Sequence, residues 1–99
     1  MIEDNESNAY LARFLLERRG HEVVVAPTGA EGVALARTSR YDLILLDLRL
    51  PDGDGCDFVP GLVPAGAEDP TPVIAVSAHA LSADRVRAIE VGCCAFIDK

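Results

Sequence analysis

The chain has 99 residues, of which 49% are hydrophobic and 25% are charged, and its formal net charge is −7. This length fits one globular domain, and the composition is too apolar for a disordered segment. The acidic balance argues against binding of nucleic acid or of an anionic membrane, and no apolar run approaches the roughly 20 residues that span a bilayer.

The first half of the chain predicts a helix, a strand, a second helix and a second strand, at residues 7–19, 23–25, 28–37 and 43–46. Leu11, Phe14 and Leu15 fall on one side of the first helix, and Gly20 after it is a typical C-terminal cap. The second helix begins with the sequence TGAE, which has the form of a capping box. Both strands are short apolar runs, a pattern that indicates burial on both faces of a parallel sheet.

The second half predicts a strand, a helix and a last short strand, at residues 73–76, 82–91 and 95–97. Ser82 can cap this helix and Gly92 can end it. Residues 56–63 should form a further helix between two strands, but they include Pro60 and Gly61. Interior Pro and Gly cost about 3 and about 1 kcal/mol relative to Ala, so we expect this helix to be short, displaced or broken.

The order of these elements predicts an α/β fold with βαβ crossovers and a parallel sheet covered by helices on both faces. In such sheets, ligands bind at the carboxyl ends of the strands. Only Met1 and Ile2 precede the first acidic pair, which leaves almost no first strand.

The three cysteines are odd in number, and Cys93 and Cys94 are adjacent, so a disulfide framework is not expected. Adjacent residues of an extended chain point to opposite sides, and both side chains are expected to be packing residues. A reducing compartment such as the cytoplasm fits this cysteine usage best.

Carboxylates follow two apolar runs of the predicted sheet. Glu3 and Asp4 follow Ile2, and Asp47 follows the strand at residues 43–46. If these strands are neighbours, the carboxylates converge, and two like charges at about 4 Å repel by about 4 kcal/mol at an effective dielectric of about 20. A cation would compensate this repulsion, and a small set of oxygen ligands suits Mg²⁺ with retained waters. For each carboxylate taken alone, a solvated surface position is the alternative.

Two further polar side chains follow the later strands. Ser77 comes directly after residues 73–76, and Lys99 follows residues 95–97. Alone, Ser77 would be a turn or capping residue and Lys99 a solvated charge. With Asp47 they supply a carboxylate nucleophile, a hydroxyl donor and a cation. Phosphoryl transfer depends on such positioning and charge neutralisation.

Four motifs, in this order and spacing, resemble the receiver domain of two-component response regulators over essentially the whole chain. They are IEDN at residues 2–5, DLILLDLRLPDGDG at residues 42–55, PVIAVSAH at residues 72–79 and GCCAFIDK at residues 92–99. The resemblance implies a flavodoxin-like, doubly wound parallel sheet of five strands in the order 2-1-3-4-5. Relative to that fold the chain would lack most of strand 1 and the final helix, so residues 1–99 are expected to be a single receiver domain truncated at both ends.

The resemblance also implies how a phosphoryl group would be bound. Asp47 would accept it from a histidine of a partner protein. Lys99, Ser77 and the backbone amide of Ala78 would contact its oxygens. Phe96 occupies the position of the family's switch aromatic, which turns inward as Ser77 moves toward the phosphoryl group.

For the metal, the resemblance implies Mg²⁺ bound directly by Asp4, Asp47 and the backbone carbonyl of Arg49, with Glu3 acting through water. The implied function is a cytoplasmic phosphoacceptor that takes its phosphoryl group from a histidine kinase or a histidine phosphotransfer protein. It would then act on a second copy of itself or on a downstream protein. It would catalyse only its own phosphorylation and dephosphorylation, and so would not be an enzyme toward another substrate.

Three other functions compete with this one. An aspartyl-phosphate phosphatase of the haloacid dehalogenase type needs an acid two residues after the nucleophile, where this chain has Arg49. A calcium loop that starts at Asp52 needs a glycine at the position of Asp57. A phosphorylation-independent interaction module on the same fold stays open, although it would have no use for this whole set of polar residues. The sequence leaves the cognate kinase, the signal and the output unassigned.

Overall fold

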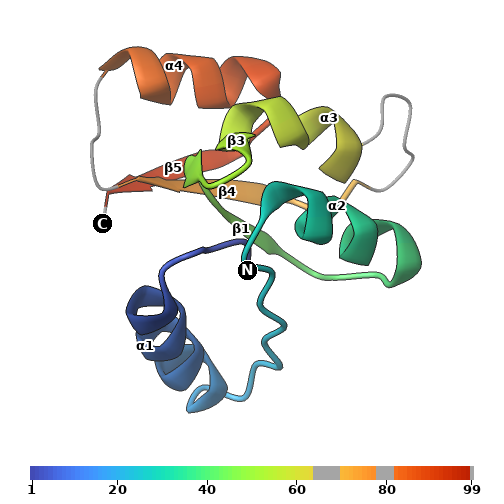
Figure 1. Ribbon diagram of the computed structural model, residues 1–99, viewed down its shortest axis with the longest axis vertical. Helices are drawn as coiled ribbons and strands as arrows, with labels where there is room; N and C mark the ends of the chain where they lie inside the picture. Colours follow the sequence, from blue (N-terminus) through green and yellow to red (C-terminus); the bar gives the residue numbers. More distant parts are fainter. Residues whose placement is uncertain (64–69, 78–81, 99) are drawn as a thin grey trace.

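The computed structural model describes residues 1–63, 70–77 and 82–98. The helices are α1 (Glu6–Glu17), α2 (Gly29–Thr38), the 3₁₀ helix η1 (Gly55–Phe58), α3 (Val59–Leu62) and α4 (Ser82–Val91). The strands are β1 (Ile44–Asp47), β2 (Arg49–Leu50), β3 (Gly53–Asp54), β4 (Val73–Ser77) and β5 (Ala95–Asp98). Figure 1 shows α2, α3 and α4 on one side of the sheet and α1 on the other.

The sheet has the predicted parallel order. β1 pairs with β4 and β4 pairs with β5, both in parallel. On the other side of β1, Ile2 forms parallel bridges to Leu46 and to Ala26. The Ile2 N–H donates to the Leu45 carbonyl at 2.8 Å, and the Glu3 N–H donates to the Ala26 carbonyl at 3.0 Å. The segments therefore follow one another as residue 26, residue 2, β1, β4 and β5, which corresponds to the order 2-1-3-4-5.

The strand predicted at residues 23–25 is wrong, because this segment has no regular strand structure. Ala26 alone bridges to Ile2, and the N-terminal ammonium of Met1 donates to the Val24 carbonyl at 2.9 Å. A strand needs a partner of similar length, and the facing segment is only residues 1–3. The apolar run at 23–25 therefore stays extended but unpaired over most of its length, and Val24 is 44% exposed.

Local capping explains where the first two helices begin and end. Asn5 caps α1 by accepting a hydrogen bond from the Asn8 N–H at 3.0 Å, and Gly20 after α1 has a positive φ of 89°, as its predicted capping role requires. Thr28 caps α2 by accepting from the Glu31 N–H at 3.1 Å. This hydrogen bond is the Thr28 half of the capping box that the TGAE sequence predicted.

The later helices also follow the sequence pattern. The helix expected at residues 56–63 is indeed short and broken, since the 3₁₀ turn η1 precedes a single turn of α3. α4 spans the predicted residues and is followed by Gly92, which has a positive φ of 119°. The predicted capping by the Ser82 side chain lies outside the described part of the structure.

Helices lie on both faces of the sheet, as expected, but the two faces differ in burial. Leu46, Val73 and Ala75 face α3 and α4 and are at most 1% exposed. On the opposite face, Leu45 and Val76 are only half-buried and line a cavity beneath α1. No helix within the described ranges is both long and apolar enough to cross a membrane.

Candidate functional site

Three carboxylates meet where the chain leaves the central strands. Asp47 is the last residue of β1, and Glu3 and Asp4 directly follow the bridging residue Ile2. Each carboxylate places an oxygen so that the three oxygens lie within 4.8 Å of one another. Glu3 is 5% and Asp47 8% exposed, whereas Asp4 is exposed to solvent. The convergence expected from the sequence is therefore confirmed.

This cluster has the composition of a site for a hard cation. Buried carboxylates are costly unless hydrogen bonds or an opposite charge compensate them. All three side chains offer oxygen, which Mg²⁺ prefers, and a small number of protein ligands leaves room for water and phosphoryl oxygens. Because Asp4 is exposed, a ligand from solvent can reach the cluster.

The loop after β1 is held against the Asp47 carboxylate. The Arg49 N–H donates to Asp47 Oδ1 at 3.0 Å, and the Leu48 N–H donates to the Val76 carbonyl at 3.2 Å. The Gly55 N–H donates back to the Leu48 carbonyl at 2.8 Å. A Cβ on Gly55 would overlap the Asp47 carbonyl oxygen and lie 2.8 Å from Leu48 Cα, so only glycine fits there. Hydrogen bonds to Val76 and from Gly55 thus fix the backbone of Leu48, the residue that follows the predicted phosphoacceptor Asp47.

Ser77 lies beside this loop. It is the last residue of β4, follows the residue that pairs with Asp47, and is only 1% exposed. It lines a cleft of about 290 Å³ together with Leu48, Arg49 and Asp84. The structure therefore places Ser77 next to the segment that follows Asp47. The predicted phosphoryl contacts of Ala78 and Lys99 lie outside the described residues.

Phe96 lies in β5 opposite Ala75 and is half-buried. The guanidinium of Arg85, on α4, sits over its ring with 5.3 Å between Arg85 Cζ and the ring centroid. This is the geometry of a cation–π interaction, which is attractive because the ring face carries negative charge density. Helix α4 and the predicted switch aromatic are therefore in direct contact.

Asp52 and Asp54, for which the sequence predicted no structural contact, hold the β2–β3 hairpin. Asp52, in its turn, accepts hydrogen bonds from the Ala30 and Gly29 N–H groups of α2, and these bonds lower the pKa of its carboxyl group. Asp54 accepts from Arg87 of α4 at 2.6 Å, and the charge of Asp54 raises the pKa of that guanidinium. These pairs are separated by 22 residues or more, so no local sequence pattern could reveal them.

Comparisons with known proteins agree on one family. The sequence model of the response regulator receiver domain matches residues 1–99. The polar-differentiation response regulator DivK of Brucella anthropi is 40% identical over 99 residues, which are the whole of this chain and 80% of the relative.

Solved structures give the same result. The receiver domain of the sensor histidine kinase PA1611 from Pseudomonas aeruginosa PAO1, with a magnesium ion coordinated in its active site cleft, superposes with a TM-score of 0.87. It is 32% identical, and the match covers 99% of this chain and 80% of that one. A response regulator from Burkholderia pseudomallei, with a phosphorylated aspartic acid, a calcium ion and citrate, gives a TM-score of 0.86 at 28% identity. That match covers 99% of this chain but spans little more than half, 56%, of the Burkholderia chain.

Proposed function

This chain belongs to the response regulator receiver domain family, and from that premise we propose that it is the phosphoacceptor of a two-component phosphorelay. It takes a phosphoryl group from a histidine of a kinase or of a phosphotransfer protein onto Asp47. The observation that carries the proposal is the nearly complete burial of Asp47 beside Glu3 and Asp4 at the carboxyl end of β1.

The metal ligands in this proposal are Asp4, Asp47 and the backbone carbonyl of Arg49, with Glu3 acting through water. The oxygen-only donor set, with three carboxylate oxygens within 4.8 Å of one another, supports Mg²⁺ as the ion. When bound, the ion neutralises the negative charge that gathers where the phosphoryl oxygens meet the acidic cluster.

The chain's own residues carry the transfer. A carboxylate oxygen of Asp47 attacks the phosphorus, the nitrogen–phosphorus bond of the donor phosphohistidine breaks, and the imidazole takes the bonding electrons and leaves. The hydrogen bond from the Arg49 N–H to Asp47 Oδ1 fixes the rotation of the attacking carboxylate. The Ser77 hydroxyl, the Lys99 ammonium and the Ala78 amide then donate to the phosphoryl oxygens.

The response to phosphorylation runs through Phe96 and α4. We infer that Ser77 moves toward the phosphoryl group and that Phe96 turns inward, away from Arg85. Residues 1–99 act as a single receiver domain in the cytoplasm, and their changed surface is recognised by a second copy or by a downstream protein. Its catalysis is limited to its own phosphorylation and dephosphorylation.

Labelling with a small phosphodonor tests this function. The folded protein is incubated with phosphoramidate, with either Mg²⁺ or a chelator, and its intact mass is measured. We expect one phosphoryl group per chain with Mg²⁺, none with the chelator, and none in Asp47→Asn. Asp42→Asn is the matched control, because Asp42 is an exposed aspartate just before the opposite end of β1, and it should label like the parent protein.

Two results would contradict the proposal. Labelling of Asp47→Asn to the same extent as the parent would mean that another residue is the acceptor. A folded parent protein that takes up no phosphoryl group under any of these conditions would favour the phosphorylation-independent interaction module.

A further inference from the structure

The N-terminus of α2 carries two caps of different origin. Thr28 is a local cap, since its Oγ1 accepts from the Glu31 N–H three residues later. Asp52 reaches the same helix from the β2–β3 hairpin, accepting from Gly29 N–H at Oδ1 and from Ala30 N–H at Oδ2, both at 2.9 Å. The first N–H groups of a helix have no intrahelical partner, and the helix dipole favours a negative charge beside them. One carboxylate therefore joins the hairpin to α2 by two hydrogen bonds.

Packing keeps the hairpin against the helix at this point. A Cβ on Gly29 would overlap the ring of Phe58, so the first turn of α2 lies directly on that ring. The same ring approaches Gly53, next to Asp52, where a Cβ would lie 3.7 Å away. Gly53 has a positive φ of 145°, which side-chain-bearing residues rarely adopt. The turn of the hairpin, η1 and the start of α2 thus form one packed unit.

The hairpin leads directly to the site. Asp52 lies in the turn between β2 and β3, where Arg49 pairs with Asp54 and Leu50 pairs with Gly53. The Arg49 N–H is the donor to Asp47 Oδ1, and its carbonyl is a metal ligand in the proposed function. Only two residues separate Arg49 from Asp52, so a displaced turn would displace Arg49.

The hairpin has a second connection, to α4, which consists of ion pairs. Arg87 pairs with Asp54 at 2.6 Å and with Asp57 at 2.8 Å. The side chains of Arg87, Asp54 and Asp57 are 48%, 40% and 66% exposed, and exposed ion pairs contribute little because water screens them. Asp52 is exposed as well, but its two hydrogen bonds go to backbone N–H groups at the start of α2, and they act together with the packing of Phe58 to restrain the turn.

We propose that Asp52 is a positioning residue of the phosphoryl and metal site. By anchoring the hairpin to α2, it holds the Arg49 backbone where its N–H orients the Asp47 carboxylate and its carbonyl faces the cation. Asp52 itself touches neither the phosphoryl group nor the metal. This role rests on the proposed function, because it is there that Asp47 accepts the phosphoryl group and the Arg49 carbonyl binds the cation.

A pair of matched variants separates positioning from simple helix capping. Asp52→Ala and Thr28→Ala each remove one cap from α2, so both should lower the thermal midpoint. Mg²⁺ binding, measured by calorimetry on the folded proteins, should weaken about tenfold in Asp52→Ala, the size of effect usual for residues that orient metal ligands. Thr28→Ala should bind Mg²⁺ like the parent protein. Asp52→Asn keeps one acceptor oxygen and should fall between the parent and Asp52→Ala.

A second measurement does not depend on the metal. In the metal-free protein, amide hydrogen exchange at Arg49, followed by nuclear magnetic resonance, should be faster in Asp52→Ala than in the parent and unchanged in Thr28→Ala. If Asp52→Ala keeps the parent's Mg²⁺ affinity and Arg49 exchange rate, or if Thr28→Ala shows the same losses, the positioning role is overturned. If the parent protein binds no Mg²⁺, the proposed function fails, and Arg49 exchange alone then confirms or overturns the role of Asp52.

Discussion

The two faces of the sheet differ in how deeply they bury the side chains of the same strand. Leu45 and Leu46 are neighbours in β1 and point to opposite sides. Leu46 is fully buried in the core formed with α3 and α4. Leu45 instead lines a cavity of about 270 Å³ beneath α1, together with Leu11 and Leu15 of that helix, which are 57% and 51% exposed. The cohesion of the chain therefore lies mainly on the α2–α4 face.

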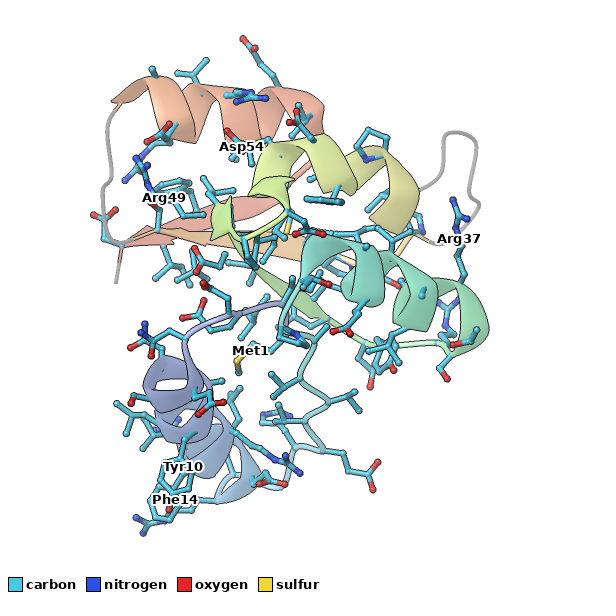
Figure 2. The ribbon with its side chains drawn as sticks, viewed as in Figure 1. Met1, Tyr10, Phe14, Arg37, Arg49 and Asp54 are labelled. Carbon is cyan, nitrogen blue, oxygen red and sulfur yellow. The ribbon has the colours of Figure 1, made fainter. Side chains whose placement is uncertain are left out.

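The acidic cluster lies at the margin of the less covered face. Glu3 and Asp47 line the same cavity as Leu45, so the proposed phosphoacceptor borders the looser side of the sheet. Figure 2 shows Tyr10 and Phe14 side by side on α1 and turned away from the sheet, and their ring centroids are 6.5 Å apart. Binding sites commonly occupy the less stable parts of a fold, because ligand access needs surfaces that can rearrange. In this chain, the closely packed core lies on one face of the sheet, and the proposed phosphoacceptor borders the other face.

Truncation of neighbouring leucines should reveal the largest difference between the two faces of the sheet. Leu46→Ala should lower the free energy of unfolding by about 3 kcal/mol, because it leaves a cavity in a closely packed core. Leu45→Ala should cost about 1 kcal/mol, since its side chain is only half-buried. Urea denaturation of both variants measures the difference. Equal costs would show that α1 covers its face as tightly as α3 and α4 cover theirs.

Cysteine reactivity reports on how tightly the α2–α4 face is closed. Cys56 and Cys93 are in the core, at 2% and 4% exposed, while Cys94 is exposed. Burial raises the pKa of Cys56 from 9.0 to about 11, which lowers its thiolate population about a hundredfold, and burial also raises the pKa of Cys93.

Iodoacetamide should therefore label the native protein at Cys94 alone, and peptide mass spectrometry locates the label. Cys94→Ser should abolish this labelling until a denaturant is added. Labelling of Cys93 at the rate of Cys94 would mean that α4 opens readily.

Acidification gives the smallest expected effect. The two backbone hydrogen bonds hold the pKa of Asp52 below its ordinary value of 3.8. Its contribution to stability is therefore complete above that value and is lost as the pH falls through the lower folded-state pKa. The stability difference between the parent and Asp52→Asn, measured by urea denaturation, should be constant near neutral pH and shrink in strong acid. A difference that grows in acid would contradict the capping geometry.

Much of the fold could be read from local pattern. Apolar runs located β1, β4 and β5 to within a residue or two, and the TGAE sequence located Thr28 as the N-terminal cap of α2. Pro60 and Gly61 predicted the broken helix of η1 and α3. The apolar run at residues 23–25 predicted a strand that does not form, because strand formation depends on a pairing partner that these residues cannot reveal.

The candidate site was also only partly predictable from the sequence. Acids directly after apolar runs indicated that Glu3, Asp4 and Asp47 would meet, because strand ends of a parallel sheet share an edge. The roles proposed for Ser77, Lys99 and Phe96 still rest on resemblance. Asp52 gave no signal as a capping residue, because its partners in α2 are more than 20 residues away.

By itself, then, the sequence determined the type and order of the helices and of β1, β4 and β5, and the gathering of acids at one end of the sheet. Such features depend on the periodicity of apolar residues and on the residues that follow each run. Only the tertiary structure decided which face of the sheet is closely packed and which carboxylate anchors the loop beside Asp47. Burial and long-range hydrogen bonds arise when segments distant in the chain come together, and no local pattern encodes that contact.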